Sequence, residues 1–352
     1  MTPDTPLRDQ PIFICGHPKS GTSLVRAILD SHPQLIVYPE ETGFFRRYLP
    51  EASKCSPSEQ TLPSLLALAD ERLIHIFKWN QETPDPSQEG FPDRDYSAIA
   101  FEDVRENMRQ LAGQQFEHTG DILSAAILAY GQVCGRINAQ TRYWVEKSPY
   151  NEYFAEQIYA WWPDARCIHI VRDPRDNYIS YRRKHPDWSV EFFAANWTRS
   201  TGAGMRNRER FGAQRYLILR YEDLTQSPQS SLEKLTGFLQ IDWDAALTQP
   251  TRAGEQWAGN SMFADRFQGI SAAPVDRWKD NLSPEDAGVI EWMAGSLLST
   301  WGYAPLPGKT FSQLLNARWR AATWPVRGKL SRLARSEPAQ EYPKAEQEVP
   351  SE

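Results

Sequence analysis

Short hydrophobic runs recur along the chain, and each is followed by a helical pattern. Two of these runs, at residues 11–16 (PIFICG) and 35–38, flank a segment in which Leu24, Ala27 and Ile28 have helical spacing. Runs that are hydrophobic throughout are typical of strands buried on both faces of a parallel sheet. The opening therefore predicts an α/β fold with a central parallel sheet and helices on both faces. The same pattern predicts three further strands, at 142–145, 167–171 and 216–219.

A helical insertion interrupts this pattern between about residues 50 and 140. Helical periodicity at 62–77 and 122–137 lies on either side of a segment rich in Pro, Asp and Gly, 83–95, which indicates a loop. Because the α/β pattern resumes afterwards, we expect one large domain, with the insertion over one side of its site. The expected limits are a flexible N-terminus at 1–10, the α/β domain at 11–305 and a tail at 306–352.

The composition is that of an ordinary globular protein. Hydrophobic residues make up 40% and charged residues 24% of the 352 residues, so the chain can bury a core without disulfides or structural metal. The formal net charge of −6 disfavours a nucleic-acid-binding surface, and a polyanionic ligand would need a local cluster of Lys and Arg. The four cysteines have no CxxC spacing, and Cys15 and Cys167 lie within hydrophobic runs. We therefore expect neither a disulfide framework nor a metal site.

The two ends of the chain differ from the α/β region. Met1–Gln10 is polar and contains no hydrophobic run, which predicts a cytoplasmic protein without a signal peptide or a membrane anchor. Residues 318–335 are basic, with Trp319 and Trp324 between the charges. Such a segment fits either a solvated helix or a weak contact with an anionic membrane surface. Residues 336–352 are rich in Pro, Glu, Gln and Ser, which predicts an acidic, disordered end.

A first anion site is predicted at Gly16–Ser23 (GHPKSGTS), between a strand and a helix. The free N–H groups and the dipole at a helix start attract anions, and Gly21 lets the backbone approach them closely. A loop that binds nucleoside triphosphates has lysine directly after its second glycine. Here Thr22 holds that place and the lysine is Lys19, which disfavours a triphosphatase. The side-chain donors of this loop are the hydroxyls of Ser20, Thr22 and Ser23.

A second anion site is predicted after the strand at 167–171. Arg172 and Arg175 are suited to bidentate contacts with a phosphate. Ser180 follows Arg172 by eight residues, roughly two helical turns, so both can share one face of the helix. Two phosphate sites after parallel strands fit one nucleotide with two separate phosphate groups. Asp173 and Asp176 are expected to hold the arginines and to cap the helix.

The two sites together resemble those of sulfotransferases that use 3′-phosphoadenosine 5′-phosphosulfate (PAPS). The string PKSGTS around Lys19 is similar to their 5′-phosphosulfate loop, and Arg172 with Ser180 is similar to the pair that holds the 3′-phosphate. The string EKSP resembles a family turn whose lysine, here Lys147, faces the transferred sulfate. The resemblance spans about residues 11–303. It implies a P-loop-like three-layer fold, PAPS as co-substrate and PAP as product.

Further positions extend the resemblance. Tyr221, in the string RYEDL, is implied to lie near the nucleotide, and Ser261 and Arg277 are implied to line its 3′-phosphate and base. Trp197 fits either a stacking contact with adenine or the hydrophobic core. The opening stretch, through His32-Pro33 to the string EET at residues 40–42, looks most like tyrosylprotein sulfotransferases and their bacterial relatives. The helical insertion contains no string of the family, and acceptor choice is expected to depend on it.

Sulfuryl transfer requires cations at the transferring group, a rigidly held nucleotide and a base for the acceptor hydroxyl. The resemblance implies Lys19 and Lys147 as the cations, and no metal is expected because they supply the charge. It implies Glu41 as the base, by its match to the second glutamate of the family string. Glu40 is the second candidate, because the match needs a one-residue insertion, and His17, in the loop beside Lys19, is the third.

The sequence therefore predicts a sulfotransferase that uses PAPS and a hydroxyl acceptor. A glycan, a lipid-linked glycan or a small metabolite is the favoured acceptor, and peptide tyrosines stay open. One alternative is a P-loop small-molecule kinase, which the missing lysine after Gly21 disfavours. The other is a non-catalytic protein that binds PAP or PAPS, which would have no need of Lys19, Lys147 and the glutamates.

Overall fold

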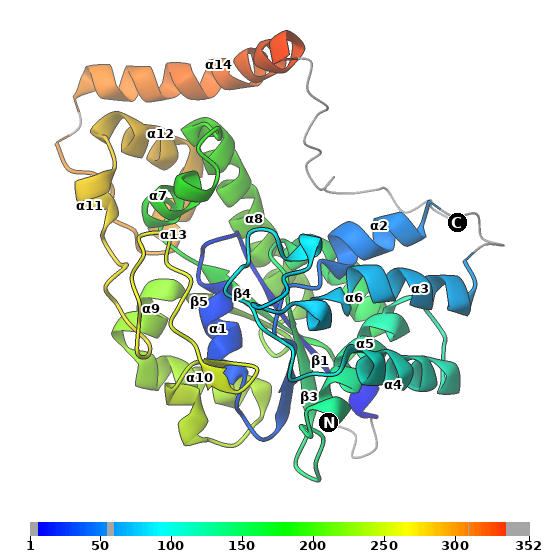
Figure 1. The fold of residues 1–352 in the computed structure, drawn as a ribbon. Coiled ribbons are helices and arrows are strands. Elements are labelled where there is room, and N and C mark those ends of the chain that lie inside the picture. Colours follow the sequence, from blue (N-terminus) through cyan, green and yellow to red (C-terminus); the bar gives the residue numbers. More distant parts are fainter. Residues whose placement is uncertain (1–5, 55–59, 309, 336–352) are drawn as a thin grey trace.

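Five parallel strands form the central sheet of the protein (Figure 1). The computed structural model describes residues 6–54, 60–308 and 310–335, and of 325–335 it describes the backbone. The strand order is β2-β3-β1-β4-β5, so β1 lies at the centre. The predicted parallel sheet is confirmed, with the strands β1 (Pro11–Cys15), β2 (Leu35–Val37), β3 (Tyr143–Lys147), β4 (Arg166–Val171) and β5 (Tyr216–Arg220).

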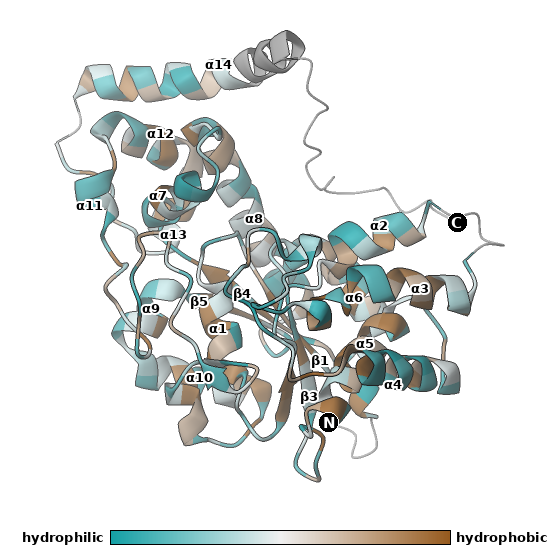
Figure 2. Cartoon of the chain, in the orientation of Figure 1, coloured by the Kyte–Doolittle hydropathy of each residue, from teal (hydrophilic) through white to brown (hydrophobic). Residues whose placement is uncertain are grey.

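Both faces of the sheet are buried, which explains why the strands are hydrophobic throughout. Side chains alternate between the faces along each strand. On β1, Phe13 and Cys15 belong to one hydrophobic cluster, and Ile12 and Ile14 belong to another on the opposite face. Figure 2 shows hydrophobic residues on the strands at the centre and hydrophilic residues along α4 (Phe101–Gln114) at the surface.

Helices cover both faces and complete a three-layer fold. The cluster around Ile12 is covered by α1 (Thr22–Leu29), α9 (Tyr221–Gln226) and α10 (Pro228–Leu239). The cluster around Phe13 is covered by α5 (Gly120–Val133), α6 (Ala155–Trp161) and α8 (Val190–Phe211). Because all the strands are parallel, their carboxyl ends meet at one edge, where ligands of such folds bind.

The predicted insertion is helical, and it does more than cover the site. Its helix α5 packs against β2 and β3, so the insertion also completes the core on one face of the sheet. The predicted helix at 62–77 ends earlier, because Leu73 is followed by a separate 3₁₀ turn. The predicted loop at 83–95 contains a short turn. The remaining elements are η2 (Phe44–Tyr48), α2 (Leu49–Ala52), α3 (Leu62–Arg72), η3 (His75–Lys78) and η4 (Pro86–Gln88).

The N-terminal segment at 1–10, which was expected to be flexible, contains one short element where the structure describes it. Leu7–Asp9 forms a 3₁₀ turn, η1. Arg8 lies 3.4 Å from the buried carboxylate of Asp121 and donates a hydrogen bond to the carbonyl of Gln115. This ion pair fixes the turn on the insertion. Residues 1–5 lie outside the described residues.

The C-terminal part of the domain carries helices that lie beside α7 (Pro174–Lys184) and α8. The expected tail contains one long helix, α14 (Phe311–Arg335), which packs against α12 (Figure 1). Residues 336–352, predicted to be disordered, lie outside the described residues. No helix in the described part of the chain is long and hydrophobic enough to span a membrane. The other elements are η5 (Asn151–Phe154), η6 (Ala245–Thr248), β6 (Thr251–Arg252), β7 (Glu255–Gln256), α11 (Trp278–Asn281), α12 (Pro284–Ala294) and α13 (Ser296–Thr300).

Candidate active site

The loop between β1 and α1 turns sharply at two positions. Gly21 has a φ of 106° and precedes the first residue of α1. A Cβ atom at this position would lie 2.4 Å from the ring of Tyr221, so glycine is needed both for the backbone angle and for the close packing. Lys19 has a φ of 66°, in the left-handed region. The loop therefore holds a specific shape over the start of α1.

A cavity of about 1200 Å³ opens at the carboxyl edge of the sheet, above this loop. Almost all of the predicted site residues line it, although they come from segments far apart in the chain. Ser20 is the exception among the predicted loop donors, because its side chain is buried beneath the loop. The predicted residues in the cavity wall are Lys19, Gly21, Thr22, Ser23, Glu40, Glu41, Lys147, Arg172, Ser180, Tyr221, Ser261 and Arg277.

Lys147 and Glu41 form an ion pair in this cavity. The Lys147 ammonium donates to Glu41 Oε1 at 2.5 Å. Lys147 is buried at the end of β3, whereas the Glu41 carboxylate is half-exposed. Desolvation acts to raise the pKa of Glu41, but the charge and the hydrogen bond of Lys147 lower it more, so the net pKa is below its ordinary value. Glu41 is therefore ionised at neutral pH.

The buried side chain of Glu146 stabilises the turn that follows β3. Its buried carboxylate accepts hydrogen bonds from Thr42 at 2.7 Å, Ser148 at 2.6 Å and Asn151 at 2.6 Å. Alternation along β3 sends Glu146 and Lys147 to opposite faces, so one residue anchors the turn while the next reaches the cavity. Because Thr42 follows Glu41, this network also fixes the segment that carries the predicted base.

Lys19 reaches the same cavity from the loop. Burial lowers the pKa of Lys19 to about 8, and the neighbouring charges of Lys184 and Lys147 act in the same direction, whereas Glu41 opposes them. A cation so close to other cations is poised to accept an anion. Lys19 and Lys147 therefore supply two positive charges around one carboxylate.

Arg172 lies at the other end of the loop, as predicted next to Ser180. Its guanidinium donates to the Lys19 carbonyl at 3.1 Å and to the Pro274 carbonyl at 3.0 Å, and one nitrogen lies 3.5 Å from Ser180 Oγ. It also stacks on Tyr221, 4.6 Å from the ring centre. Arg172 Nε is buried without a hydrogen-bond partner among the described residues.

Arg175 does not take part in the site, which corrects the prediction of two phosphate-binding arginines. Its guanidinium is buried and forms ion pairs with Asp173 at 2.6 Å and Glu291 at 2.7 Å. It also stacks on Trp278, 3.9 Å from the ring centre. These contacts consume its donors, so Arg175 joins α7 to α12 instead. Asp173 caps α7 as predicted, accepting from the Arg175 N–H at 2.8 Å.

Ser261 and Arg277 are joined through one carboxylate. Asp265 accepts from Ser261 Oγ at 2.7 Å and from Arg277 Nη1 at 2.5 Å. Arg277 also lies over the ring of Phe263, 5.0 Å from its centre. The structure thus brings both residues to the cavity, on a segment that closes it from the side of Arg172.

Glu40 and His17, the other candidate bases, are engaged elsewhere. Glu40 Oε1 accepts from Arg94 at 2.6 Å and from Tyr96 at 2.7 Å, and lies 3.6 Å from Arg252. His17 is buried under the loop and outside the cavity wall, and burial lowers its pKa to about 4. Trp197 is also buried, where its indole donates to the Arg172 carbonyl, so it belongs to the core.

Sequence reasoning missed the residues that η2, the insertion and the segment at the end of α7 contribute. The expectation that the insertion covers one side of the site was the available signal, because its side chains follow no family string. These residues mix aromatic rings with cations, and few carboxylates face them. They are Arg46, Arg47, His75, Trp79, Phe91, Arg94, Lys184 and Trp188.

Three comparisons place this arrangement among known proteins. A model described as the sulfotransferase family matches residues 11–245. Protein-tyrosine sulfotransferase A of Caenorhabditis elegans is 22% identical over 306 residues, which are 84% of this chain and 67% of that protein. Protein-tyrosine sulfotransferase 1 of Danio rerio is 25% identical over 309 residues, which are 85% of this chain and 68% of that protein.

Two further matches bear on length and fold. An uncharacterized protein of Aquifex aeolicus is 22% identical over 77% of this chain, and the chain spans 30% of its length. The sulfotransferase domain of the Synechococcus PCC 7002 olefin synthase is 22% identical, with a TM-score of 0.53 over 85% of this chain and 96% of that one. This likeness shows the fold. Since the family model covers well over half of the sequence, the chain belongs to the sulfotransferase family.

Proposed function

We propose that the protein transfers a sulfuryl group from PAPS to a hydroxyl acceptor and releases PAP. The observation that carries the proposal is the Lys147–Glu41 pair, which lies in one cavity with the phosphate loop and with Arg172. Cations for the transferring group and a carboxylate for the acceptor proton thus share one space. The family match supports sulfuryl transfer independently of this geometry.

The residues present fit a nucleotide with 5′- and 3′-phosphate groups. Arg172 Nε is a buried donor without a partner among the described residues, next to Ser180. A buried unpaired donor is costly unless a ligand satisfies it. At the other end, Gly21 and the start of α1 present backbone N–H groups. Arg172 and Ser180 would hold the 3′-phosphate, and Lys19 with residues 21–23 would hold the 5′-phosphosulfate.

The roles of the catalytic residues follow from their positions. When bound, PAPS would supply the sulfuryl group, which passes to the acceptor oxygen while the acceptor proton passes to Glu41. Glu41 is ionised at neutral pH and can take this proton. Lys147 orients Glu41 and, with Lys19, stabilises negative charge on the transferring group and the departing phosphate. Neither Glu40 nor His17 is as well placed to act as the base.

The alternatives explain the site less well. A P-loop kinase would need lysine after Gly21, where Thr22 stands and forms part of α1. A non-catalytic binding protein would have no use for a carboxylate paired with Lys147 in the cavity. Both alternatives predict different ligand behaviour, which the following experiment measures.

The experiment that tests the donor is calorimetric titration with PAP, ADP and Mg²⁺–ATP. We expect PAP to bind without Mg²⁺ at least about tenfold more tightly than ADP, roughly 1.4 kcal/mol. Arg172→Ala should remove this preference, whereas Lys279→Ala, at an exposed lysine, should retain it. A preference for Mg²⁺–ATP, or equal binding of PAP and ADP, would refute the donor assignment.

The acceptor is proposed as a hydroxyl compound that enters beside the insertion. The names of the curated relatives suggest tyrosine in proteins, and a glycan or a small metabolite is the class expected from the sequence. The aromatic rings of Trp79, Phe91 and Trp188 suit a flat phenol or a sugar ring, and Arg46 and Arg47 suit a negative charge nearby. Transfer of ³⁵S from PAPS to a tyrosine peptide, an oligosaccharide and a phenol would rank these classes.

A further inference from the structure

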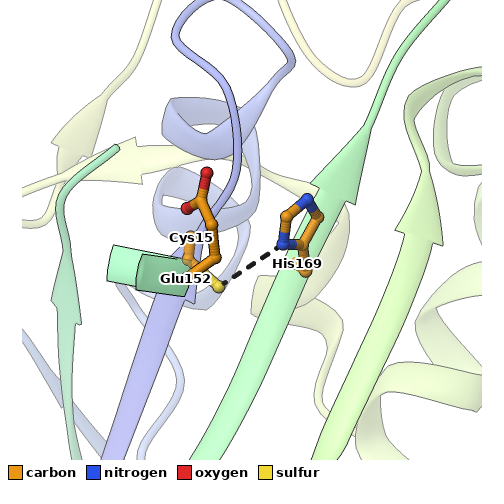
Figure 3. Close-up of side chains that lie close together, drawn as sticks. All are labelled: Cys15, Glu152 and His169. Carbon is orange, nitrogen blue, oxygen red and sulfur yellow. Dashed lines mark hydrogen bonds between the residues drawn. The ribbon is translucent and has the colours of Figure 1, made fainter. Parts of the chain in front are cut away.

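A buried carboxylate lies directly beneath the phosphate loop, outside the cavity wall (Figure 3). Glu152, from the turn η5, lies beside Cys15 of β1 and His169 of β4, and donor atoms of the three side chains all lie within 4.8 Å of one another. All three residues are buried. Glu152 has no part in the transfer step described above, although it lies next to the first residue of the loop.

Both carboxylate oxygens of Glu152 accept hydrogen bonds. The Gly16 N–H donates to Glu152 Oε2 at 2.9 Å, and the Ser200 hydroxyl of α8 donates to Oε1. The Asn207 side chain, also from α8, donates to the Glu152 carbonyl at 2.7 Å. Since protein donors occupy both oxygens, this carboxylate serves as an anchor between segments.

The anchor joins the two segments that carry the catalytic lysines. Glu152 lies five residues after Lys147, and Gly16 lies three residues before Lys19. A second bond runs the opposite way, because the Tyr150 N–H donates to the Gly16 carbonyl at 3.3 Å. Gly16 packs closely against β4, since a Cβ atom there would lie 2.5 Å from the Ile170 carbonyl oxygen.

We propose that Glu152 is a positioning residue for sulfuryl transfer: its carboxylate fixes the phosphate loop against the turn after β3, and so sets the distance between Lys19 and Lys147. The inference rests on the proposed function. It adds a residue that touches neither nucleotide nor acceptor and acts through Gly16. Small errors in the placement of reacting groups cost large factors in rate, on the order of 100-fold for 1 Å.

The surroundings of Glu152 favour a charge that changes near neutral pH. Burial raises the pKa of Glu152 to about 7, against the hydrogen bonds that lower it. Burial also raises the pKa of Cys15 and lowers the pKa of His169 to about 3, so both neighbours are neutral at pH 7. The other titratable or charged groups around it are Arg46, whose charge lowers the pKa of Glu152, Glu146, Tyr150, Tyr153 and Tyr216.

Ionisation should strengthen the anchor. A carboxylate accepts stronger hydrogen bonds from N–H and O–H groups than a carboxylic acid does. The ionised fraction of Glu152 rises as pH increases through about 7. We therefore expect kcat of the wild type to rise several-fold between pH 6 and pH 7, through this residue, in the range where Lys19, with a pKa of about 8, still keeps most of its charge.

The test compares Glu152→Ala and Glu152→Gln with the wild type in PAPS turnover. The alanine variant removes both acceptors and should lower kcat on the order of 10- to 100-fold, with a smaller change in PAP affinity. The glutamine variant keeps an acceptor for the Gly16 N–H but is neutral like the protonated acid, so its kcat should match that of the wild type at pH 6 and should change little between pH 6 and 7. Cys167→Ala, in the hydrophobic cluster that also contains Cys15, is the matched control and should lower Tm while retaining kcat.

The outcomes separate this inference from the proposed function. If the wild type turns over PAPS and Glu152→Ala does so equally fast, Glu152 is a purely structural residue and the inference is wrong. If Glu152→Gln keeps the full pH dependence, the dependence comes from another group and the role of ionisation is refuted. If the wild type neither turns over PAPS nor prefers PAP to ADP, the proposed function fails, and this inference fails with it.

Discussion

Lys19 combines a left-handed backbone with a side chain that gives up its proton easily. The backbone angle is uncommon for a residue with a side chain, and the Arg172 guanidinium, which donates to the Lys19 carbonyl, helps to hold it. Burial lowers the pKa of its ammonium most, and the charges of Lys184 and Lys147 in the same cavity lower it further, so the neutral amine is favoured. The charge that the reaction needs is therefore present over a limited range of pH.

The first prediction concerns this limit. Because the pKa of Lys19 is about 8, its charge is complete below that pH and is lost above it, so kcat should fall as pH rises through about 8. Lys19→Arg keeps its charge at higher pH and should move this decline upward. Lys19→Ala should lower kcat on the order of 100- to 1000-fold without loss of Tm. A pH–rate profile of the three proteins decides the matter, and an unchanged decline in Lys19→Arg would contradict the assignment.

The second prediction separates the two candidate bases. Glu41→Gln cannot take a proton and should lower kcat on the order of 100- to 10,000-fold, while PAP still binds. Glu40→Gln is the matched control. It weakens the contacts to Arg94 and Tyr96, which hold a loop of the insertion, so the KM of the acceptor should rise while kcat changes less. Steady-state kinetics measure both constants, and the reverse result would make Glu40 the base.

At the residue scale, local motifs were predictable and their long-range partners were not. Arg172 and Ser180 meet as predicted, although Arg172 lies before α7, which begins at Pro174, and not on the helix itself. Arg175 differs because Glu291, its partner, lies 116 residues later in the chain. Ser20 differs because its side chain is buried and does not line the cavity. For both residues, the course of the backbone determines which groups the side chain contacts. A single sequence motif does not specify that course.

Among the elements, α14 presents two unlike faces. On one side, Ala317 is buried and Arg320 forms ion pairs with Glu191 at 2.9 Å and Asp286 at 3.0 Å, which attach the helix to α8 and α12. On the other side, Phe311 is 76% exposed and Trp319 is 58% exposed, and both belong to one helical stripe. The sequence of the helix contains five arginines, one lysine and no Asp or Glu.

The third prediction tests the membrane contact that the sequence left open. A basic helix with exposed aromatic residues is suited to the surface of anionic lipid. We expect the full chain to sediment with vesicles of phosphatidylglycerol and phosphatidylcholine, and less with phosphatidylcholine alone. Replacing Phe311, Leu315 and Trp319 by serine should abolish this binding. Trp243→Ser, at an exposed tryptophan elsewhere, is the control. If the triple variant sediments with the vesicles as much as the wild type does, these residues do not bind the membrane and α14 is a solvated helix.

Element positions were predictable where periodicity was strong. The strands lie within a few residues of their expected limits, because each is a hydrophobic run buried on both faces. The basic segment at 318–335, for which a solvated helix was one expectation, lies in the helix α14, which begins earlier and attaches to the domain through Ala317 and Arg320. The insertion was recognised as helical, yet its packing against β2 and β3 depends on tertiary contacts that periodicity does not encode.

For the molecule as a whole, the site is assembled from distant segments. The strand order β2-β3-β1-β4-β5 places the ends of β1 and β3 side by side, which brings the loop of Lys19 to Lys147. The sequence predicted a parallel sheet but contained no signal for this order, because pairing is decided by how the helices pack on each face. Binding of one nucleotide then connects segments that are otherwise joined only through the core.

The fourth prediction follows from this assembly. A ligand that binds the native state alone stabilises it by about 2.7 kcal/mol at 100 times its Kd, so PAP should raise Tm by several degrees. ADP, at equal concentration, should raise it less, since it lacks the group that Arg172 and Ser180 are proposed to hold. Arg172→Ala should weaken PAP binding by roughly 2–4 kcal/mol and make the two ligands equivalent. Thermal melts with each ligand measure the difference, and a persistent advantage of PAP in this variant would contradict the assignment.

The residues that line the cavity are far apart in the sequence, and this separation has a consequence during translation. The wall begins with residues of the loop near Lys19 and is closed by Arg277. A ribosome that has released the loop, β3 and β4 has therefore made the parts proposed to bind phosphate, but the wall near Arg172 still lacks Arg277 and Pro274. A nascent chain that stops short of these residues has an incomplete cavity wall, so we expect it to bind the proposed nucleotide less tightly than the full chain does.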